Sequence, residues 1–284
     1  MNEFKIQKGN LDTEEFVELS KLFKRVFKKN ISIEFLNWYY CENPNGNAIS
    51  NNILLNQKII GHYALIPIKI NLFNRIVKAG LSVFTAIDEE YRGLYLFNKI
   101  TNATYQNAKD IGIEFVIGVS NNLSTKLFLR YFKFKLISQL DVKIGVGNLK
   151  KIKQVTDFKL FWNNESIKWR LRNPNFKYKI KIHNKNFSIY NDFYKFFSIH
   201  MGNFFIKEFP DLEYKYFTKK NFNLLNLWVG LGSFDWKNAL YYNLPEKLKP
   251  APLNLIMKNL KEKDNFNFPK KENIEFKLVD FDIF

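Results

Sequence analysis

The sequence contains little cysteine and histidine. Cys41 is the single cysteine among 284 residues, so no disulfide can form within the chain, and chains without disulfides are typical of reducing compartments. The three histidines, His62, His183 and His200, do not have the spacing of metal ligands. We therefore expect a cytoplasmic protein without a metal site.

Long apolar runs are also missing. No stretch approaches the roughly 18 consecutive apolar residues that a membrane-spanning helix needs. The N-terminal segment MNEFKIQKGNLDTEEF mixes charges of both signs and has no apolar core. We therefore predict no export signal and no membrane span.

The chain is strongly basic, with 44 Lys and Arg residues, 27 Asp and Glu residues and a formal charge of +17. Such a charge attracts polyanions, including nucleic acid, anionic lipid, coenzyme A and nucleotide-diphosphate sugars. The basic residues are scattered through every segment, and no nucleic-acid-binding motif is present. We therefore expect small-molecule substrates and no nucleic-acid partner.

Helical and strand periodicities alternate in the first half. Asp12 and Glu15 resemble a capping box before a first helix, and a second helix is predicted after Ser32. Later patterns predict strands over 53–55, 59–70 and 81–87, a helix over 94–111, a strand over 114–119, a helix over 123–131 and one strand over 134–146. Strands 81–87 and 114–119 flank a helix, so we predict that they are parallel neighbours.

The second half contains a faint echo of the first. The segment 169–174, WRLRNP, resembles 38–44, WYYCENP, and apolar hairpin-like segments follow both. We interpret this echo as an ancient duplication, with chance in an aromatic-rich chain as the alternative. The resulting domains are 1–152 and 153–284. In the second, 224–229 and 253–257 are predicted strands and 236–242 a predicted helix.

Two segments carry a family resemblance. They are 85–93, TAIDEEYRG, and 118–124, GVSNNLS, with Phe128 and Phe134 following. In this order and at this separation they resemble the GNAT N-acyltransferase superfamily. The resemblance implies an α+β fold, an α/β/α sandwich around a mixed, mostly antiparallel sheet, with a degenerate GNAT-like domain after the first. It also implies acetyl-CoA or another acyl-CoA as the acyl donor.

The resemblance further implies a phosphate-binding turn at Arg92 and Gly93. Free N–H groups and the dipole at a helix start suit pyrophosphate, although Tyr95 and Phe97 replace later glycines of the family's turn. An ordinary strand-to-helix turn is the alternative, as is simple helix capping for Asn121 and Ser124. The backbone at Ala86 and Ile87 would follow the pantetheine arm and meet the thioester oxygen. The implied acyl-CoA contacts are Ala86, Ile87, Arg92, Gly93, Leu94, Tyr95, Asn121 and Ser124.

Acyl transfer to an amine needs a proton acceptor and benefits from a proton donor for the leaving thiolate. His62 is the candidate base, because it lies in the central hairpin strand and histidine titrates near neutrality; a structural histidine is the alternative. Glu89 at the strand end is a second candidate, although its charge also suits a helix start. The family's tyrosine acid falls at Leu129. Tyr131 is the nearby candidate acid, although a position two residues further along a helix points in another direction; catalysis through ordered water is the alternative.

Tandem GNAT arrangements resemble the sugar N-acyltransferases of surface-polysaccharide pathways, whose acceptor is a nucleotide-linked amino sugar. The second half has no Arg-Gly turn, so we expect a single acyl-CoA site, with the second half contributing to the acceptor site. Two alternatives are aminoacyl transfer from charged tRNA, as in peptidoglycan-bridge enzymes, and a non-catalytic binding protein. The candidate acceptor contacts are Trp169, Arg170, Arg172, Tyr178 and Trp228.

Overall fold

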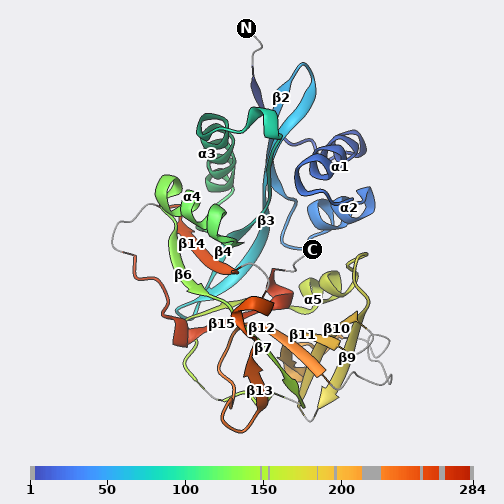
Figure 1. Cartoon of the computed structure of the whole chain (residues 1–284), viewed down its shortest axis with the longest axis vertical. Coiled ribbons are helices and arrows are strands. Elements are labelled where there is room, and N and C mark those ends of the chain that lie inside the picture. The colour runs from blue at the N-terminus through green and yellow to red at the C-terminus, as the bar shows by residue number, and fades with distance from the viewer. Residues whose placement is uncertain are drawn as a thin grey trace.

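The computed structural model describes residues 4–147, 149–152, 154–183, 185–194, 197–212, 225–249, 252–261 and 266–281. Within these ranges the side chains of Leu94, Phe193, Tyr194 and Glu246 are not described. The fold is α+β with a large, mostly antiparallel sheet, as predicted. Helices cover both faces of its first half (Figure 1).

Two helices, α1 (Thr13–Phe27) and α2 (Ile33–Cys41), cover one face of the first half. The Asp12 carboxylate accepts the backbone N–H of Glu15 at 2.8 Å, and the Ser32 hydroxyl accepts that of Phe35 at 3.1 Å. Such N-caps satisfy donors that the first turn of a helix leaves unpaired. Both predicted helices are therefore confirmed, and each begins at its predicted residue.

The strands of the first half follow the predicted order. They are β1 (Lys5–Lys8), β2 (Ile49–Leu55), β3 (Lys58–Leu72), β4 (Arg75–Ile87), β5 (Phe115–Ser120) and β6 (Lys135–Gln139). A short 3-10 turn, η1 (Glu89–Tyr91), and the helices α3 (Leu94–Asp110) and α4 (Asn122–Phe132) complete this half. The predicted parallel pairing is confirmed, because residues 79–81 of β4 pair with 115–117 of β5.

The second half repeats part of this order. Its elements are β8 (Phe158–Leu160), α5 (Asn164–Leu171), β9 (Tyr178–His183), β10 (Asn186–Tyr194), β11 (Phe197–Phe205), β12 (Leu225–Leu231), β13 (Leu240–Asn243), β14 (Asn254–Asn259) and β15 (Ile274–Lys277). Short 3-10 turns are η2 (Ile206–Glu208), η4 (Glu246–Leu248), η5 (Lys271–Asn273) and η6 (Leu278–Asp280). Strands β11 and β12 are parallel, as β4 and β5 are.

The two halves exchange strands. The prediction of one strand over 134–146 is wrong, because the chain leaves the first sheet at Leu140 after β6, and β7 (Asp141–Val146) lies between β12 and β13. In return, β14 lies between β5 and β6. The apolar alternation continues across Leu140, so periodicity could not show the change of partner. The predicted helix over 236–242 is also wrong, since a turn and β13 occupy it.

Strands β8 and β15 join the halves into one sheet, because β8 pairs with β3 and β15, and β15 pairs with β12. The division into domains 1–152 and 153–284 remains a proposal, in which each domain contains one strand of the other. None of the described helices is long and apolar enough to cross a membrane. In the same ranges, no group of His, Cys, Asp and Glu side chains could hold a metal ion.

Candidate active site

The two parallel strands β4 and β5 separate towards their carboxyl ends. Their pairing ends at Leu81 and Ile117, while β4 continues to Ile87 in contact with β3 on its other side. The β4 edge from residue 82 onward is therefore unpaired towards β5. An unpaired strand edge presents N–H and C=O groups that a ligand can bind.

A β-bulge lies in this free part of β4. The pairing of β3 with β4 passes from His62 opposite Ala86 to Ala64 opposite Val83. Two residues, Phe84 and Thr85, therefore share one partner position, and Phe84 has a φ of 48°. A bulge redirects side chains and bends the strand, and here it lies where β4 leaves β5.

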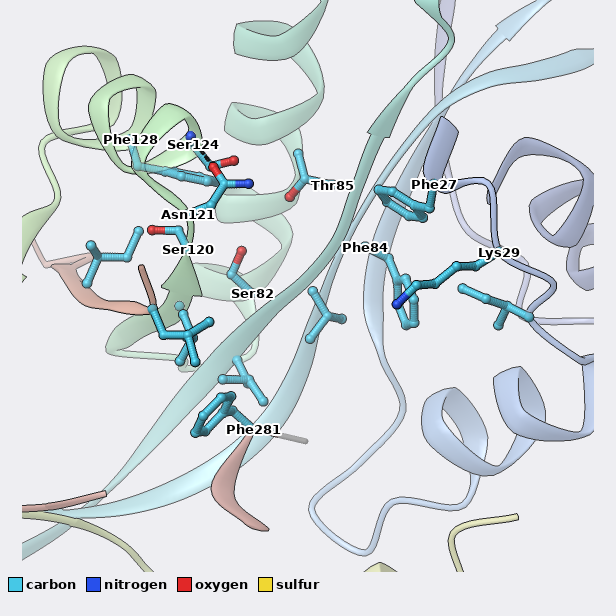
Figure 2. Close-up of a pocket in the computed structure, with 17 residues that line it drawn as sticks. Phe27, Lys29, Ser82, Phe84, Thr85, Ser120, Asn121, Ser124, Phe128 and Phe281 are labelled. Atoms are coloured by element: carbon cyan, nitrogen blue, oxygen red, sulfur yellow. Dashed lines mark hydrogen bonds between the residues drawn. The ribbon is translucent and has the colours of Figure 1, made fainter. Parts of the chain in front are cut away.

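The space between the separated strands is a cavity of about 480 Å³. Figure 2 shows that Ser120, Asn121, Ser124 and Phe128 line one side, Ser82 and Thr85 lie in the middle, and Phe27, Lys29 and Phe84 line the other side. Residues of the second half close the cavity, namely Leu253, Ile256 and Phe281. The hydroxyl of Ser82 is held by that of Tyr63 at 2.9 Å.

A second cavity of about 670 Å³ continues the first. Both are lined by Phe27, Thr85, Asn121, Ser124 and Phe128. The second extends to Ile87, Arg92, Gly93 and Tyr131, at the start of α3 and along α4. We call the two cavities together the β4–β5 cleft.

The Arg92 end of the cleft suits an anion. Gly93 is the N-cap residue of α3, it offers no side chain to cap the first turn, and no acidic residue lies in that turn. The N–H groups at such a helix start bind phosphate groups together with the helix dipole. The half-exposed Arg92 guanidinium binds the Ile87 carbonyl at 3.3 Å and Glu89 at 3.2 Å. These groups fit the diphosphate of coenzyme A.

Of the other residues predicted to contact acyl-CoA, some line the cleft and others do not. Ile87 lines the cleft, whereas Ala86 is buried and does not. Leu94 begins α3, and its side chain is among those that the structure does not describe. Tyr95 is 64% exposed, lies under the Lys99 ammonium and does not line the cleft. The backbone of the α3 first turn, and not the Tyr95 ring, is therefore available to a phosphate.

Asn121 and Ser124 lie where the two cavities meet. The Asn121 side-chain oxygen accepts the Ser124 backbone N–H at 2.9 Å and so caps α4. Both side chains also line the cleft. Capping fixes Asn121 at the end of β5, directly across from Thr85 (Figure 2).

His62 cannot be the base, which corrects the expectation from the sequence. Its side chain is fully buried; Nδ1 lies 2.6 Å from the Asn52 side-chain oxygen and Nε2 lies 2.9 Å from the Tyr40 hydroxyl. Asn52 in turn donates to Glu15 at 2.9 Å, so its oxygen accepts from His62. Burial lowers the pKa of His62 to about 3. A neutral imidazole without exposed surface has a structural role.

The remaining catalytic candidates lie on the Arg92 side. Glu89 is exposed and pairs with Arg92 without lining the cleft. Tyr131 is 39% exposed and lines the cleft. Leu129 packs against the core, whereas its neighbour Phe128 faces the cleft. Among the described lining residues, only Lys29, Arg92 and Tyr131 carry titratable side chains.

The predicted acceptor contacts in the second half are largely core residues. Trp169, Arg170 and Trp228 are at most 2% exposed, so they cannot stack on a substrate, and this expectation is wrong for them. Arg172 and Tyr178 are partly exposed but do not line the cleft. The second half contributes Leu253 and Ile256 instead, because strand exchange brings β14 beside β5, and it also contributes Phe281, which follows η6.

The sequence of the first half identifies the family of this site. Residues 9–131 match the family model of the acetyltransferase (GNAT) domain. This part of the chain is a GNAT domain. The match confirms the predicted enzyme class, an N-acyltransferase with acyl-CoA as donor. No curated protein matches the sequence.

Solved structures share the fold across most of the chain. A probable N-acyltransferase from Enterococcus faecalis is 11% identical, with a TM-score of 0.63 over 91% of this chain and 73% of that chain. A GCN5-related N-acetyltransferase from Kribbella flavida is 8% identical, with a TM-score of 0.59 over 91% and 71%. Saccharomyces cerevisiae N-myristoyltransferase, solved with bound myristoyl-CoA, is 9% identical, with a TM-score of 0.51 over 75% and 66%. At these low sequence identities, the similarity shows a shared fold and nothing more.

Proposed function

We propose that the chain transfers an acyl group from acyl-CoA, bound in the β4–β5 cleft, to the amine of an amino sugar in the cytoplasm. The supporting observation is the unpaired β4 edge over residues 82–87, which faces the end of β5 and leads to the uncapped start of α3. An extended pantetheine arm can pair with a strand edge while its diphosphate meets a helix N-terminus.

In this proposal each part of the cleft has its own role. Arg92 and the first turn of α3 hold the diphosphate, and the β4 backbone at the bulge donates to the thioester oxygen, where negative charge develops. Tyr131 is the candidate proton donor for the thiolate. No carboxylate or histidine lines the described cleft, so water takes the proton that the acceptor nitrogen loses when the amide bond forms.

The first cavity of the cleft supports a polar acceptor. Ser120 and Asn121 offer hydroxyl and amide groups on one side, Ser82 lies in the middle, and Lys29 adds a positive charge on the other side. Hydroxyl and amide groups match the hydrogen bonds of a sugar, and an ammonium suits the phosphate of a nucleotide-linked sugar. The acyl group itself meets the apolar wall of Leu81, Val83 and Ile256.

A thiol-release assay tests the acceptor. Acetyl-CoA and longer acyl-CoAs are incubated with nucleotide-linked amino sugars, free amino sugars and simple amines, and the N-acyl product is verified by mass spectrometry. We expect coenzyme A release that depends on an amino sugar. Release with other amines alone would contradict the acceptor and leave the enzyme class intact. Aminoacyl transfer from charged tRNA without acyl-CoA turnover would favour the peptidoglycan-bridge alternative.

A further inference from the structure

A separate cavity lies in the second half of the chain. Its volume is about 720 Å³, and it is lined by residues of the segments 149–152 and 154–159, by β10 and β11, and by Glu275 of β15. It shares no lining residue with the β4–β5 cleft. Small-molecule sites commonly have volumes of roughly 300–1,000 Å³. We call it the lysine cavity, after Lys150, Lys151 and Lys159, which line it.

Positive charge exceeds negative charge in the lysine cavity. Among its described lining residues Glu275 is the one carboxylate, and the ammonium groups of Lys151 and Lys277 both bind it. Burial alone would raise the pKa of Glu275, but these two lysines lower it to about 2. Glu275 is thus already neutralised, and neither Lys150 nor Lys159 has an ion-pair partner among the described residues.

Lys159 and Lys277 are close enough to Lys151 to repel its ammonium group. Burial lowers the pKa of Lys151, and the charges of Lys277 and Lys159 lower it further against the attraction of Glu275. Solvated lysines on an ordinary surface avoid such crowding. A bound anion would relieve the repulsion, so the cluster gains free energy from an anionic ligand.

Polar and aromatic groups complete the lysine cavity. Asn186 lines the lysine cavity, but its side-chain oxygen is buried and does not face the open space. Asn203 donates to the Ser188 hydroxyl at 2.9 Å beside it. The Phe205 ring is 39% exposed, with the Lys151 ammonium 5.8 Å from its centroid. An exposed ring offers a stacking surface for a planar group.

We propose that the lysine cavity binds a nucleotide. Its phosphates lie among Lys150, Lys151 and Lys159, and its base stacks on Phe205. This site is separate from the acyl-transfer cleft, so the nucleotide is bound there as a second ligand and not as the acyl acceptor.

Calorimetric titration with UDP tests the site. In the variant Lys150→Ala/Lys159→Ala we expect UDP affinity to fall by at least about tenfold, because two of the three phosphate contacts are lost. The matched control, Lys24→Ala/Lys135→Ala, removes the same charge from exposed positions outside the cavity and should bind UDP like the wild type. Phe205→Ala should weaken UDP binding but leave pyrophosphate binding unchanged, because only UDP carries a base.

Arg92→Ala separates the two possible places of binding, because acyl-CoA also carries a nucleotide diphosphate. UDP binding that is lost in Arg92→Ala and kept in Lys150→Ala/Lys159→Ala would place UDP in the cleft and overturn the proposal. Absence of UDP binding to the wild type would overturn it as well. Acyl-CoA should bind the double lysine variant as tightly as it binds the wild type. A failure of the nucleotide proposal can therefore be told apart from a failure of the proposed acyl transfer.

Discussion

The indole rings of Trp38 and Trp169 stack on each other, with centroids 4.9 Å apart and planes inclined by 19°. Each indole N–H donates to the backbone carbonyl of the other residue, in both cases at 3.1 Å. The two residues hold equivalent positions in α2 and α5, the segments of the predicted echo. The reciprocal contact supports a duplication whose two copies meet at these helices.

The contact between Trp38 and Trp169 should stabilise the whole chain. We expect Trp169→Ala to lower the free energy of unfolding by about 3–5 kcal/mol, because it empties a buried aromatic site. Trp169→Phe should cost less, about 1–2 kcal/mol, mainly from the unpaired carbonyl of Trp38. Urea denaturation measures both, with the 70% exposed Tyr242 changed to alanine as control. Equal losses for Trp169→Ala and Tyr242→Ala would contradict the structure.

Acid should destabilise the fold through its buried histidines. Burial lowers the pKa of His62 and of His200 to about 3, with a further contribution from Lys277 for His200. An unfolded histidine titrates near 6.5, so between these values the unfolded chain binds more protons. The free energy of unfolding therefore falls below about pH 6.5, by about 1.4 kcal/mol per pH unit for each histidine.

Asp280 opposes this trend over part of the range. Burial raises its pKa to about 6 against the effects of Lys277 and Trp162, so its contribution is present at low pH and lost as the pH rises towards 6. Urea denaturation at several pH values between 7 and 5 measures the sum. His62→Gln should reduce the pH dependence by the contribution of one histidine, and an unchanged slope would show that His62 is not the buried neutral group described here.

Gly118 should control access to the cleft. A Cβ atom there would meet Ile256 and Ser82 at 3.4 to 3.6 Å, which is ordinary contact, so Gly118→Ala should be tolerated. Gly118→Leu should reduce acyl-CoA turnover by at least about tenfold, since the larger side chain enters the space between β4 and β5. Thermal denaturation checks that the variant is folded. Full activity of a folded Gly118→Leu protein would place the reaction elsewhere.

Tyr131→Phe tests the candidate proton donor. If the phenol protonates the leaving thiolate, kcat should fall by about 100-fold or more while acyl-CoA affinity is kept. Tyr95→Phe is the matched control, because Tyr95 is exposed and lies outside the cleft. Steady-state kinetics and calorimetry separate the two effects. An unchanged kcat in Tyr131→Phe would assign protonation to water.

Local patterns in the sequence predicted the part of the site that is built from adjacent elements. The order of β4, α3, β5 and α4, the turn at Arg92 and the cap at Asn121 all depend on residues close together in the chain. Contacts between residues that are far apart in the sequence produce no local pattern that could predict them. Lys29 follows α1 in a solvated loop, and Leu253 and Ile256 reach the cleft because β14 of the second half pairs with β5.

The misassignment of His62 has the same origin. Strand periodicity places His62 in β3 but does not show which face of that strand α1 and α2 cover. Tyr40 comes from α2 and Asn52 from β2, and together they enclose both ring nitrogens. A histidine in a central strand therefore has no functional meaning until its neighbours are known.

Calorimetric titration of acyl-CoA into the wild type, Arg92→Ala and Glu89→Gln tests the central claim most directly, namely that acyl-CoA binds in the β4–β5 cleft. We expect the wild type to bind. Arg92→Ala should bind about five- to tenfold more weakly, because one exposed charge-assisted phosphate contact contributes about 1 kcal/mol. Glu89→Gln should bind at least as tightly as the wild type, because Arg92 loses its competing partner. Equal affinities in the wild type and Arg92→Ala, or no binding at all, would contradict the claim.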